Sequence, residues 1–252
     1  MKADYSNFTG NQHMKYRNEL KFICSEAACR VLECRIKGIM RQDPHVDPDG
    51  TYRIRTLYFD DRNDSAYYEN ENGIRKREKF RIRIYNGDAS NITLECKEKI
   101  NGLNHKYQTA LTNEQFKQIL LPEQFSPEDI TDPLIQQLYK EQCTRMLKPK
   151  VIVDYVRTPY VYPDGNVRIT FDKNLSASND IASFLKKDIP LVPVMPQGVC
   201  ILEVKYDDFL PHFIYEIMQT GRLRQTTFSK YYICRSFYKN HLILEDYTHG
   251  CY

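Results

Sequence analysis

The chain has 252 residues, which allows one large domain or two small ones. It is 41% hydrophobic and 27% charged, as is ordinary for a globular protein that can bury a sizeable core. Its formal net charge is only +3, so total charge does not indicate nucleic acid or a membrane as a partner. Any such partner has to be inferred from where the charges lie.

The N-terminal residues do not resemble a targeting segment. Met1 is followed by KADYSNFTG, which has no apolar core of a secretory signal. No window approaches the ~18 apolar residues of a membrane span. We therefore expect a cytoplasmic protein with no membrane span in this chain.

The eight cysteines fit that expectation. Cys24, Cys29 and Cys34 are five residues apart, and no CxxC pair occurs, so the spacing is not that of zinc ligands. We predict reduced thiols that serve as packing residues.

Alternation of apolar and polar residues predicts strands along most of the chain. In chain order they cover residues 16–22, 52–61, 77–86, 92–99, 103–111, 149–162, 167–175 and 200–207. Turn sequences separate several of them, including NGD after Tyr85 and NG at Asn101–Gly102.

Helical periodicity fills the other segments. Ser25 can cap a helix that runs to about Met40. The polar segment 63–76 is predicted to hold a short helix and a turn at Asn72–Gly73. Further helices are predicted within 112–147, where Pro122, Pro127 and Pro133 divide them, within 210–221, and toward residue 238.

These elements predict one α+β domain, spanning residues 1–252 with a core at about 16–238, on an antiparallel sheet of about eight strands. If the sheet curls into a barrel, alternation places one face of every strand inside. The apolar faces would then pack outward against helices, and the charged faces would line a tunnel.

The polar faces of six strands carry far more basic than acidic residues. A solvated sheet face usually mixes the two signs, because like charges on neighbouring strands repel. The arginine pairs Arg53/Arg55 and Arg81/Arg83 suit bidentate contact with phosphate oxygens. The basic positions are Arg17, Lys21, Arg53, Arg55, Arg81, Arg83, Lys97, Lys99, Arg168 and Lys205; the acidic ones are Glu19, Glu95, Asp172 and Glu203.

Two interpretations of this face remain open from the residues alone: a solvated sheet surface, and a tunnel that a polyanion neutralises. In the second, glutamates among arginines can hold Mg²⁺ or Mn²⁺ together with substrate phosphates. Glu19, Glu95 and Asp172 can equally be salt-bridge partners of the arginines. Asp154 lies on the opposite strand face from Arg157, and we predict a structural role for it.

Eight blocks of the sequence, in order, resemble the VTC domain, the polyphosphate polymerase domain of the triphosphate tunnel metalloenzymes and a relative of the CYTH phosphatases. They are YRNELKF, YRIRTLYFDD, REKFRIRIYNGD, LECKEKINGL, VIVDYVRTPY, NVRITFDKNL, ILEVKYD and FSKY, between residues 16 and 238. The resemblance implies an eight-stranded antiparallel tunnel barrel with surrounding helices. It also implies an enzyme that transfers the γ-phosphate of ATP to a growing polyphosphate chain with Mn²⁺ or Mg²⁺.

The resemblance also implies roles for individual residues. Phosphate-contacting catalytic residues would be Lys21, Arg81, Arg83, Lys97, Arg157 and Lys230. Further substrate-binding residues would be Arg53, Arg55, Lys106, Arg168 and, from the strand pattern, Lys205. Glu203 would be the principal metal ligand, with Glu19 as a second.

One departure from the relatives bears on activity. The phosphatases carry ExExK on the first strand, whereas here the residues are Arg17, Glu19 and Lys21. This favours a polymerase over a triphosphate hydrolase of the same fold. A non-catalytic polyphosphate-binding module is the third alternative. Nucleic acid is not expected as a partner, because no RNP, KH or helix-turn-helix pattern occurs.

Overall fold

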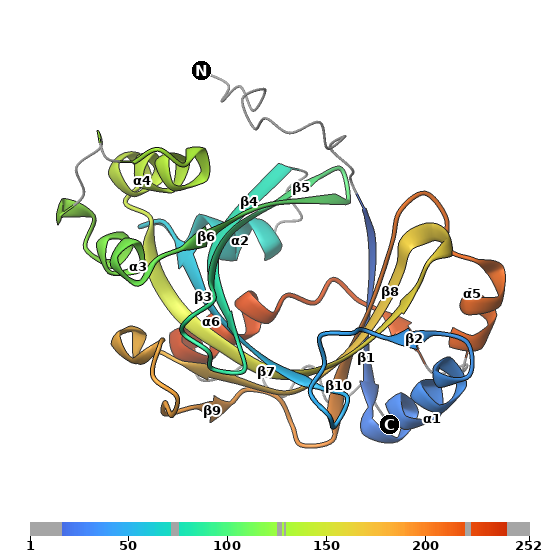
Figure 1. The fold of residues 1–252 in the computed structure, drawn as a ribbon. Helices are drawn as coiled ribbons and strands as arrows, with labels where there is room; N and C mark the ends of the chain where they lie inside the picture. Colours follow the sequence, from blue (N-terminus) through green and yellow to red (C-terminus); the bar gives the residue numbers. More distant parts are fainter. Residues whose placement is uncertain (1–16, 72–75, 125–127, 129, 220–222, 241–252) are drawn as a thin grey trace.

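Eight long antiparallel strands form one strongly curled sheet in the computed structural model (Figure 1). The structure describes residues 17–71, 76–124, 128, 130–219 and 223–240. The long strands are β1 (Asn18–Ser25), β3 (Tyr52–Asp60), β4 (Lys76–Tyr85), β5 (Ile92–Ile100), β6 (Leu103–Leu111), β7 (Lys148–Tyr162), β8 (Val167–Ser178) and β10 (Val199–Tyr206). The predicted α+β architecture with an eight-stranded antiparallel sheet is confirmed.

The strand order is β1-β10-β8-β7-β3-β4-β5-β6. Three two-residue strands join this sheet: β2 (Arg41–Gln42) pairs with β7, β9 (Val192–Pro193) with β8, and β11 (Arg224–Gln225) with β1. The two outermost long strands, β1 and β6, are joined at one point. The amide of Arg17 donates to the carbonyl of Asn104 at 2.9 Å, and the amide of Asn104 donates back at 3.0 Å. The curl is therefore joined between the start of β1 and the start of β6.

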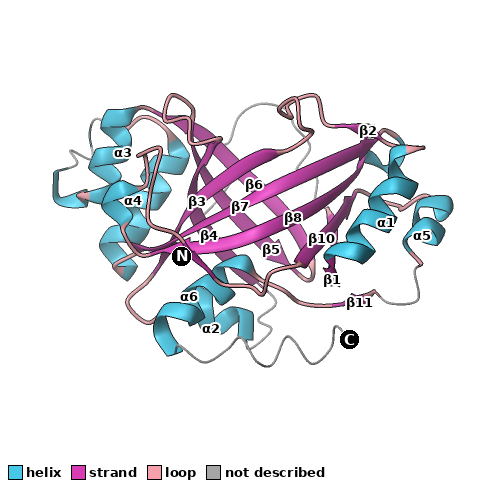
Figure 2. Ribbon diagram, turned by 90° about the horizontal axis from the view of Figure 1, so that it is seen from below, coloured by secondary structure: helices cyan, strands magenta, loops and turns pink. Residues whose placement is uncertain are grey.

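Six α-helices lie around the sheet in the part of the chain that the structure describes (Figure 2). They are α1 (Glu26–Lys37), α2 (Ser65–Glu71), α3 (Asn113–Leu120), α4 (Pro133–Arg145), α5 (His212–Met218) and α6 (Lys230–Asn240). The Ser25 cap is confirmed, because its hydroxyl accepts from the amide of Ala28 at 3.3 Å. The turn predicted at Asn72–Gly73 lies outside the described residues. No helix among those described is both long and apolar enough to cross a membrane.

Two apolar clusters cover the outer face of the sheet. One joins β3, β4, β5 and β6 to α3 and α4, with Leu57, Ile82, Leu94 and Leu138 fully buried. The other joins β1, β8 and β10 to α1 and α5. These clusters confirm that the apolar strand faces pack outward against helices.

A third cluster lies on the inner face, beside the charged residues that the alternation predicted there. It includes Tyr58, Val153 and Ile201 from the strands and Tyr231 and Cys234 from α6, all buried. Helix α6 contacts β7 and β8, and α2 contacts α6 and β4. The inner face is therefore apolar where α6 covers it and charged over the rest.

The prediction that Arg53 and Arg55 line the tunnel is wrong. In the register of β3 with β4, Thr56 is opposite Arg83 and Tyr58 is opposite Arg81, whereas Arg55 is opposite Ile84. Because directly paired residues share a face, Arg53 and Arg55 lie on the outer face and not in the predicted tunnel.

The Arg55 side chain, which was predicted to bind substrate, is instead bound by Asp154 and by the loop that contains Phe184 and Lys187. Its Nε donates to Asp154 Oδ2 at 3.0 Å, and its guanidinium also donates to the carbonyls of Phe184 and Lys187, both at 3.1 Å. Arg53 Nε donates to the other Asp154 oxygen at 2.6 Å. Asp154 thus binds two arginines on the outer face, which confirms its predicted structural role.

Replacing Asp154 with alanine should destabilise the protein strongly. Arg55 is 1% exposed, and removing one partner of a buried ion pair costs about 3–5 kcal/mol. Denaturant unfolding of Asp154→Ala should show a loss of that size. Arg53→Ala is the matched control: Arg53 is 44% exposed, and we expect a loss of about 1 kcal/mol or less. Equal stabilities of the two variants would contradict this account.

Candidate active site

The register of the sheet gathers the remaining predicted basic residues on one inner face. Paired residues on neighbouring strands are Lys21 with Glu203, Glu19 with Lys205, Lys205 with Arg168, Arg157 with Asp172, Arg81 with Glu95, and Lys97 with Lys106. We call these residues, together with Arg83, Lys79 and Lys230, the charged inner face. Three carboxylate-centred groups make up most of it.

Glu95 on β5 is the centre of the first group. Its Oε2 accepts from Arg81 Nε at 2.6 Å and lies 3.6 Å from Arg83 Nη1, while Oε1 accepts from Lys106 Nζ at 2.9 Å. Burial alone would raise the pKa of Glu95, but Arg81, Arg83 and Lys106 outweigh burial and hold that pKa well below its usual range. One ionised carboxylate therefore relieves the repulsion among three cations.

The same two arginines are fixed by polar groups on β3. Arg81 Nη1 donates to the Tyr58 hydroxyl at 3.2 Å, and Arg83 Nε donates to Thr56 Oγ1 at 3.3 Å. Both arginine side chains are mostly buried, at 13% and 8% exposed. The guanidiniums of these strand residues are thus held in position before any ligand arrives.

Asp172 and Glu203 form the second group with Arg157 and Lys230. Arg157 binds Asp172 bidentately, at 2.6 and 2.7 Å. Lys230, the first residue of α6, lies 2.7 Å from Asp172 Oδ2 and 2.6 Å from Glu203 Oε1. Burial alone would raise the pKa of Glu203, but Lys230 and the other nearby cations hold it well below its usual range. Helix α6 thus contributes a cation between two carboxylates of the sheet.

Glu19 on β1 is the centre of the third group. Lys97 Nζ of β5 donates to its Oε2 at 2.7 Å, and Lys205 and Lys21 lie 3.6 and 3.9 Å from its Oε1. Burial lowers the pKa of Lys97 to about 8, although Glu19 acts to raise it. The Lys97–Glu19 pair links β5 to β1, strands that are far apart in the sheet order.

Arg168 lies on the same strand face but has partners outside these groups. Its Nη2 lies 2.7 Å from Asp43 Oδ2 and donates to the Tyr52 hydroxyl at 2.8 Å. Arg17, where the phosphatase pattern has an acid, pairs with Asp207 at 2.9 Å beside the Arg17–Asn104 bridge. It contributes no carboxylate to the charged inner face.

Lys79 belongs to the charged inner face but was not among the predicted site residues. It is paired with Lys97 in the β4–β5 register, and its Nζ lies 5.1 Å from the centre of the Tyr231 ring. Burial lowers the pKa of Lys79 to about 7. The two-residue spacing of Lys79, Arg81 and Arg83 carried this information in the sequence.

The carboxylates suit a divalent cation only together with a ligand. In the described part of the chain, the inner-face acids do not form a group of three converging ligand atoms. Asp172 and Glu95 have short contacts on both oxygens, whereas Glu203 Oε2 has its cations at 3.4 and 3.5 Å. Glu203, with Glu19 as a second oxygen donor, fits the arrangement in which one or two carboxylates and phosphate oxygens share Mg²⁺ or Mn²⁺.

The curled antiparallel sheet and its charged inner face are the features expected from the resemblance to the VTC domain. The model of the VTC domain matches residues 16–238. The chain therefore belongs to the VTC domain family.

A solved structure shows the same fold at low sequence identity. HpAC1 from Hippeastrum, a proposed adenylyl cyclase described as having a dominant triphosphatase activity, is 12% identical with a TM-score of 0.53, covering 88% of this chain and 96% of its own. A proposed adenylate cyclase from Bacillus halodurans is 14% identical with a TM-score of 0.40, covering 82% and 88%. No match was found among curated proteins.

Binding of inorganic tripolyphosphate should draw protons onto this face. At pH 8, Lys79 and Lys97, with pKa values of about 7 and 8, are partly neutral in the free protein. An anion beside them favours the charged form and raises both pKa values, so protons are taken up on binding. Calorimetry at pH 8 in buffers of different ionisation enthalpy measures this uptake. Lys79→Met should reduce it.

The control for this experiment is Lys140→Met, which changes an exposed lysine on α4. That variant should take up as many protons as the unmodified protein. If Lys79→Met takes up as many protons as the unmodified protein and Lys140→Met, Lys79 does not face the bound anion.

Proposed function

We propose that the protein is a polyphosphate polymerase that transfers the γ-phosphate of ATP to the end of an inorganic polyphosphate chain. The observation that carries the proposal is the charged inner face, where basic side chains from seven long strands and α6 surround a few paired carboxylates. A face of this kind suits a linear polyanion whose repeating unit is a phosphate. Membership of the VTC domain family supports the same substrate class.

We infer a binding role for each group. Arg81 and Arg83, held by Glu95, Tyr58 and Thr56, would clamp phosphate oxygens by their planar guanidiniums. Lys21, Lys97, Lys106 and Lys205 would neutralise neighbouring phosphates of the triphosphate and of the chain. Arg157 and Lys230 would stabilise charge on the transferring phosphoryl group. Arg168 would contact phosphates farther along.

The reaction needs little beyond position and charge. Phosphoryl transfer is catalysed mostly by alignment of the groups and by stabilisation of the transferring charge. The acceptor is the anionic terminal phosphate of the chain, so no general base is required. The described histidines support this: His45 and His212 are largely exposed, and His105 is on the outer strand face.

A divalent cation, Mn²⁺ or Mg²⁺, completes the proposal. Glu203 and Glu19 would hold it, and it would supply positive charge that offsets the negative charge of the phosphate groups. The protein's own residues bind and orient the two phosphate substrates.

Purified protein with ATP and Mn²⁺ should produce ADP and long phosphate chains, resolved by gel electrophoresis. Arg81→Ala should reduce the rate about 100-fold or more, the usual effect of removing one pre-positioned stabilising group. Arg53→Ala removes the same side chain from the outer face of the neighbouring strand, and its activity should be unchanged. Free phosphate without chain growth would indicate the hydrolase, and tight polyphosphate binding without ATP turnover would indicate the binding module; either result would contradict the proposal.

Glu203→Gln separates metal-dependent chemistry from anion binding. The neutral amide keeps the shape of the side chain but weakens its hold on a divalent cation. Stimulation of turnover by Mn²⁺ should be lost, while tripolyphosphate binding measured by calorimetry without metal should be kept or strengthened. Full Mn²⁺-dependent activity in this variant would remove Glu203 from the proposed site.

A further inference from the structure

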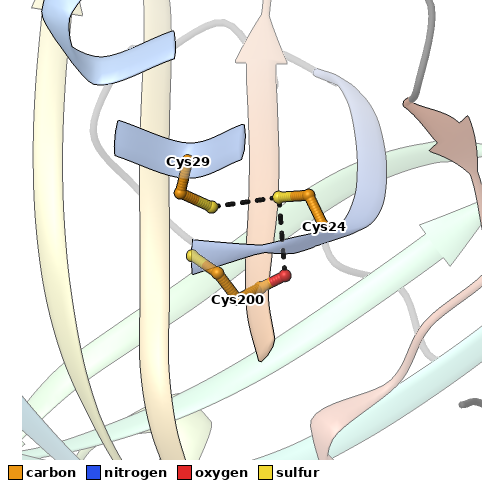
Figure 3. Close-up of side chains that lie close together, drawn as sticks. All are labelled: Cys24, Cys29 and Cys200. Carbon is orange, nitrogen blue, oxygen red and sulfur yellow. Dashed lines mark hydrogen bonds between the residues drawn. The ribbon is translucent and has the colours of Figure 1, made fainter. Parts of the chain in front are cut away.

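Three cysteines converge in the structure (Figure 3), on the face of the sheet opposite the proposed phosphate site. Cys24 lies near the end of β1, Cys29 is in the first turns of α1, and Cys200 is in β10. Cys24 and Cys200 are directly paired in the sheet, and α1 brings Cys29 over them. All three sulfur atoms lie within 4.8 Å of one another, and the Cys24 and Cys29 sulfurs are 3.0 Å apart.

These side chains point away from the charged inner face. Lys21 and Glu203 on the same two strands differ from Cys24 and Cys200 by three positions, so they occupy opposite faces. The thiols lie in the outer apolar cluster with Leu32, Phe171 and Leu202, and Cys29 and Cys200 are completely buried. This group of thiols is structurally distinct from the proposed phosphate site.

The donor set selects a class of ligand. Thiolates are soft ligands that favour Cu(I), Zn²⁺ or iron–sulfur clusters over Mg²⁺ and Mn²⁺. A structural zinc site closes with four protein ligands, but the described residues supply three here. Because the site is buried in apolar side chains, water is a poor fourth ligand. Monovalent copper, which is thiophilic and accepts two or three sulfur ligands without a fourth ligand, fits these constraints.

The geometry requires only small movements. Metal–sulfur bonds of about 2.3 Å, as for zinc, place the sulfurs of a three-coordinate ion about 4 Å apart, within the 4.8 Å that spans the three thiols. The 3.0 Å pair would separate by side-chain rotation. The Cys24 thiol, which donates to the carbonyl oxygen of Cys200 at 3.6 Å, would exchange this hydrogen bond for the metal.

We propose that Cys24, Cys29 and Cys200 form a binding site for one thiophilic metal ion, with Cu(I) as the ion that it accepts. The thiols that are still protonated would release their protons as the metal–sulfur bonds form. The ion would join α1 to β1 and β10 on the outer side of the sheet.

The test uses the full chain with competing thiols removed. Cys34 and Cys143 are exposed, and Cys251 lies outside the described residues, so all three are first replaced by serine. This reduced background protein is titrated anaerobically with Cu(I) against a chromophoric Cu(I) chelator. We expect one ion per chain, proton release on binding, a thiolate-to-copper absorption band in the ultraviolet, and a higher midpoint of thermal unfolding.

Single substitutions assign the site. Tight binding of one Cu(I) ion should be lost in each of three variants made in the background protein: Cys24→Ala, Cys29→Ala and Cys200→Ala. Cys234→Ala is the control, because Cys234 is equally buried but lies in the inner cluster, and it should keep the site. Circular dichroism before titration establishes that each variant is folded. If one cysteine variant fails to fold, the other two carry the assignment.

Two results would overturn the proposal. The first is that the background protein, with all three thiols reduced, takes up no Cu(I) in competition with the chelator. The other is undiminished binding in the folded alanine variants. Neither result depends on polyphosphate synthesis, so this site and the proposed function can fail separately.

Discussion

The charged inner face depends on a constraint on charge that is partly withdrawn from water: like-charged side chains can share such a strand face only if acids are interleaved among them. Glu95 is 1% exposed, yet it is the partner of Arg81, Arg83 and Lys106. Asp172 and Glu203 bind Arg157 and Lys230 in the same way. A buried ion without such partners would lose several kcal/mol of hydration free energy. The acids are therefore part of the framework that holds the cations in place.

Because side chains alternate along each strand, the inner face of the curled sheet carries the charged groups and the outer face packs against helices. On β1 and β10, Lys21 and Glu203 face inward, while Cys24 and Cys200 face the helix α1. On β3, Thr56 and Tyr58 support the inward arginines of β4, while Arg55 binds Asp154 on the outside. A shift of one residue in any register would exchange these roles. The hydrogen bonds of the sheet thus specify the site as strictly as they specify the fold.

Much of the fold and part of the site could be predicted from the sequence. Period-two alternation located the eight long strands, and clear polar faces such as Lys97 and Glu95 against Leu94 and Cys96 identified inward residues.

Other features could not be predicted, because they depend on pairing between distant strands. In Tyr52–Phe59 both faces mix polar and apolar residues, and only the pairing with β4 shows that Arg53 and Arg55 point outward. The three cysteines lie on β1, α1 and β10, so their convergence follows from strand pairing and helix packing that spacing along the chain does not reveal. The apolar inner cluster likewise results from the packing of α6.

The position of Lys230 between two carboxylates has a consequence for how ligands would act on one another. Its ammonium group is an internal counterion for Glu203 and Asp172, and Lys205 and Lys21 add to it. A phosphate chain that recruits these lysines would leave Glu203 with less compensated charge, and so with more affinity for another cation. By thermodynamic reciprocity, a cation bound at Glu203 would then release lysines to the phosphate chain and strengthen its binding by the same factor. The two occupants would therefore be cooperative through an exchange of partners, without any movement of the sheet.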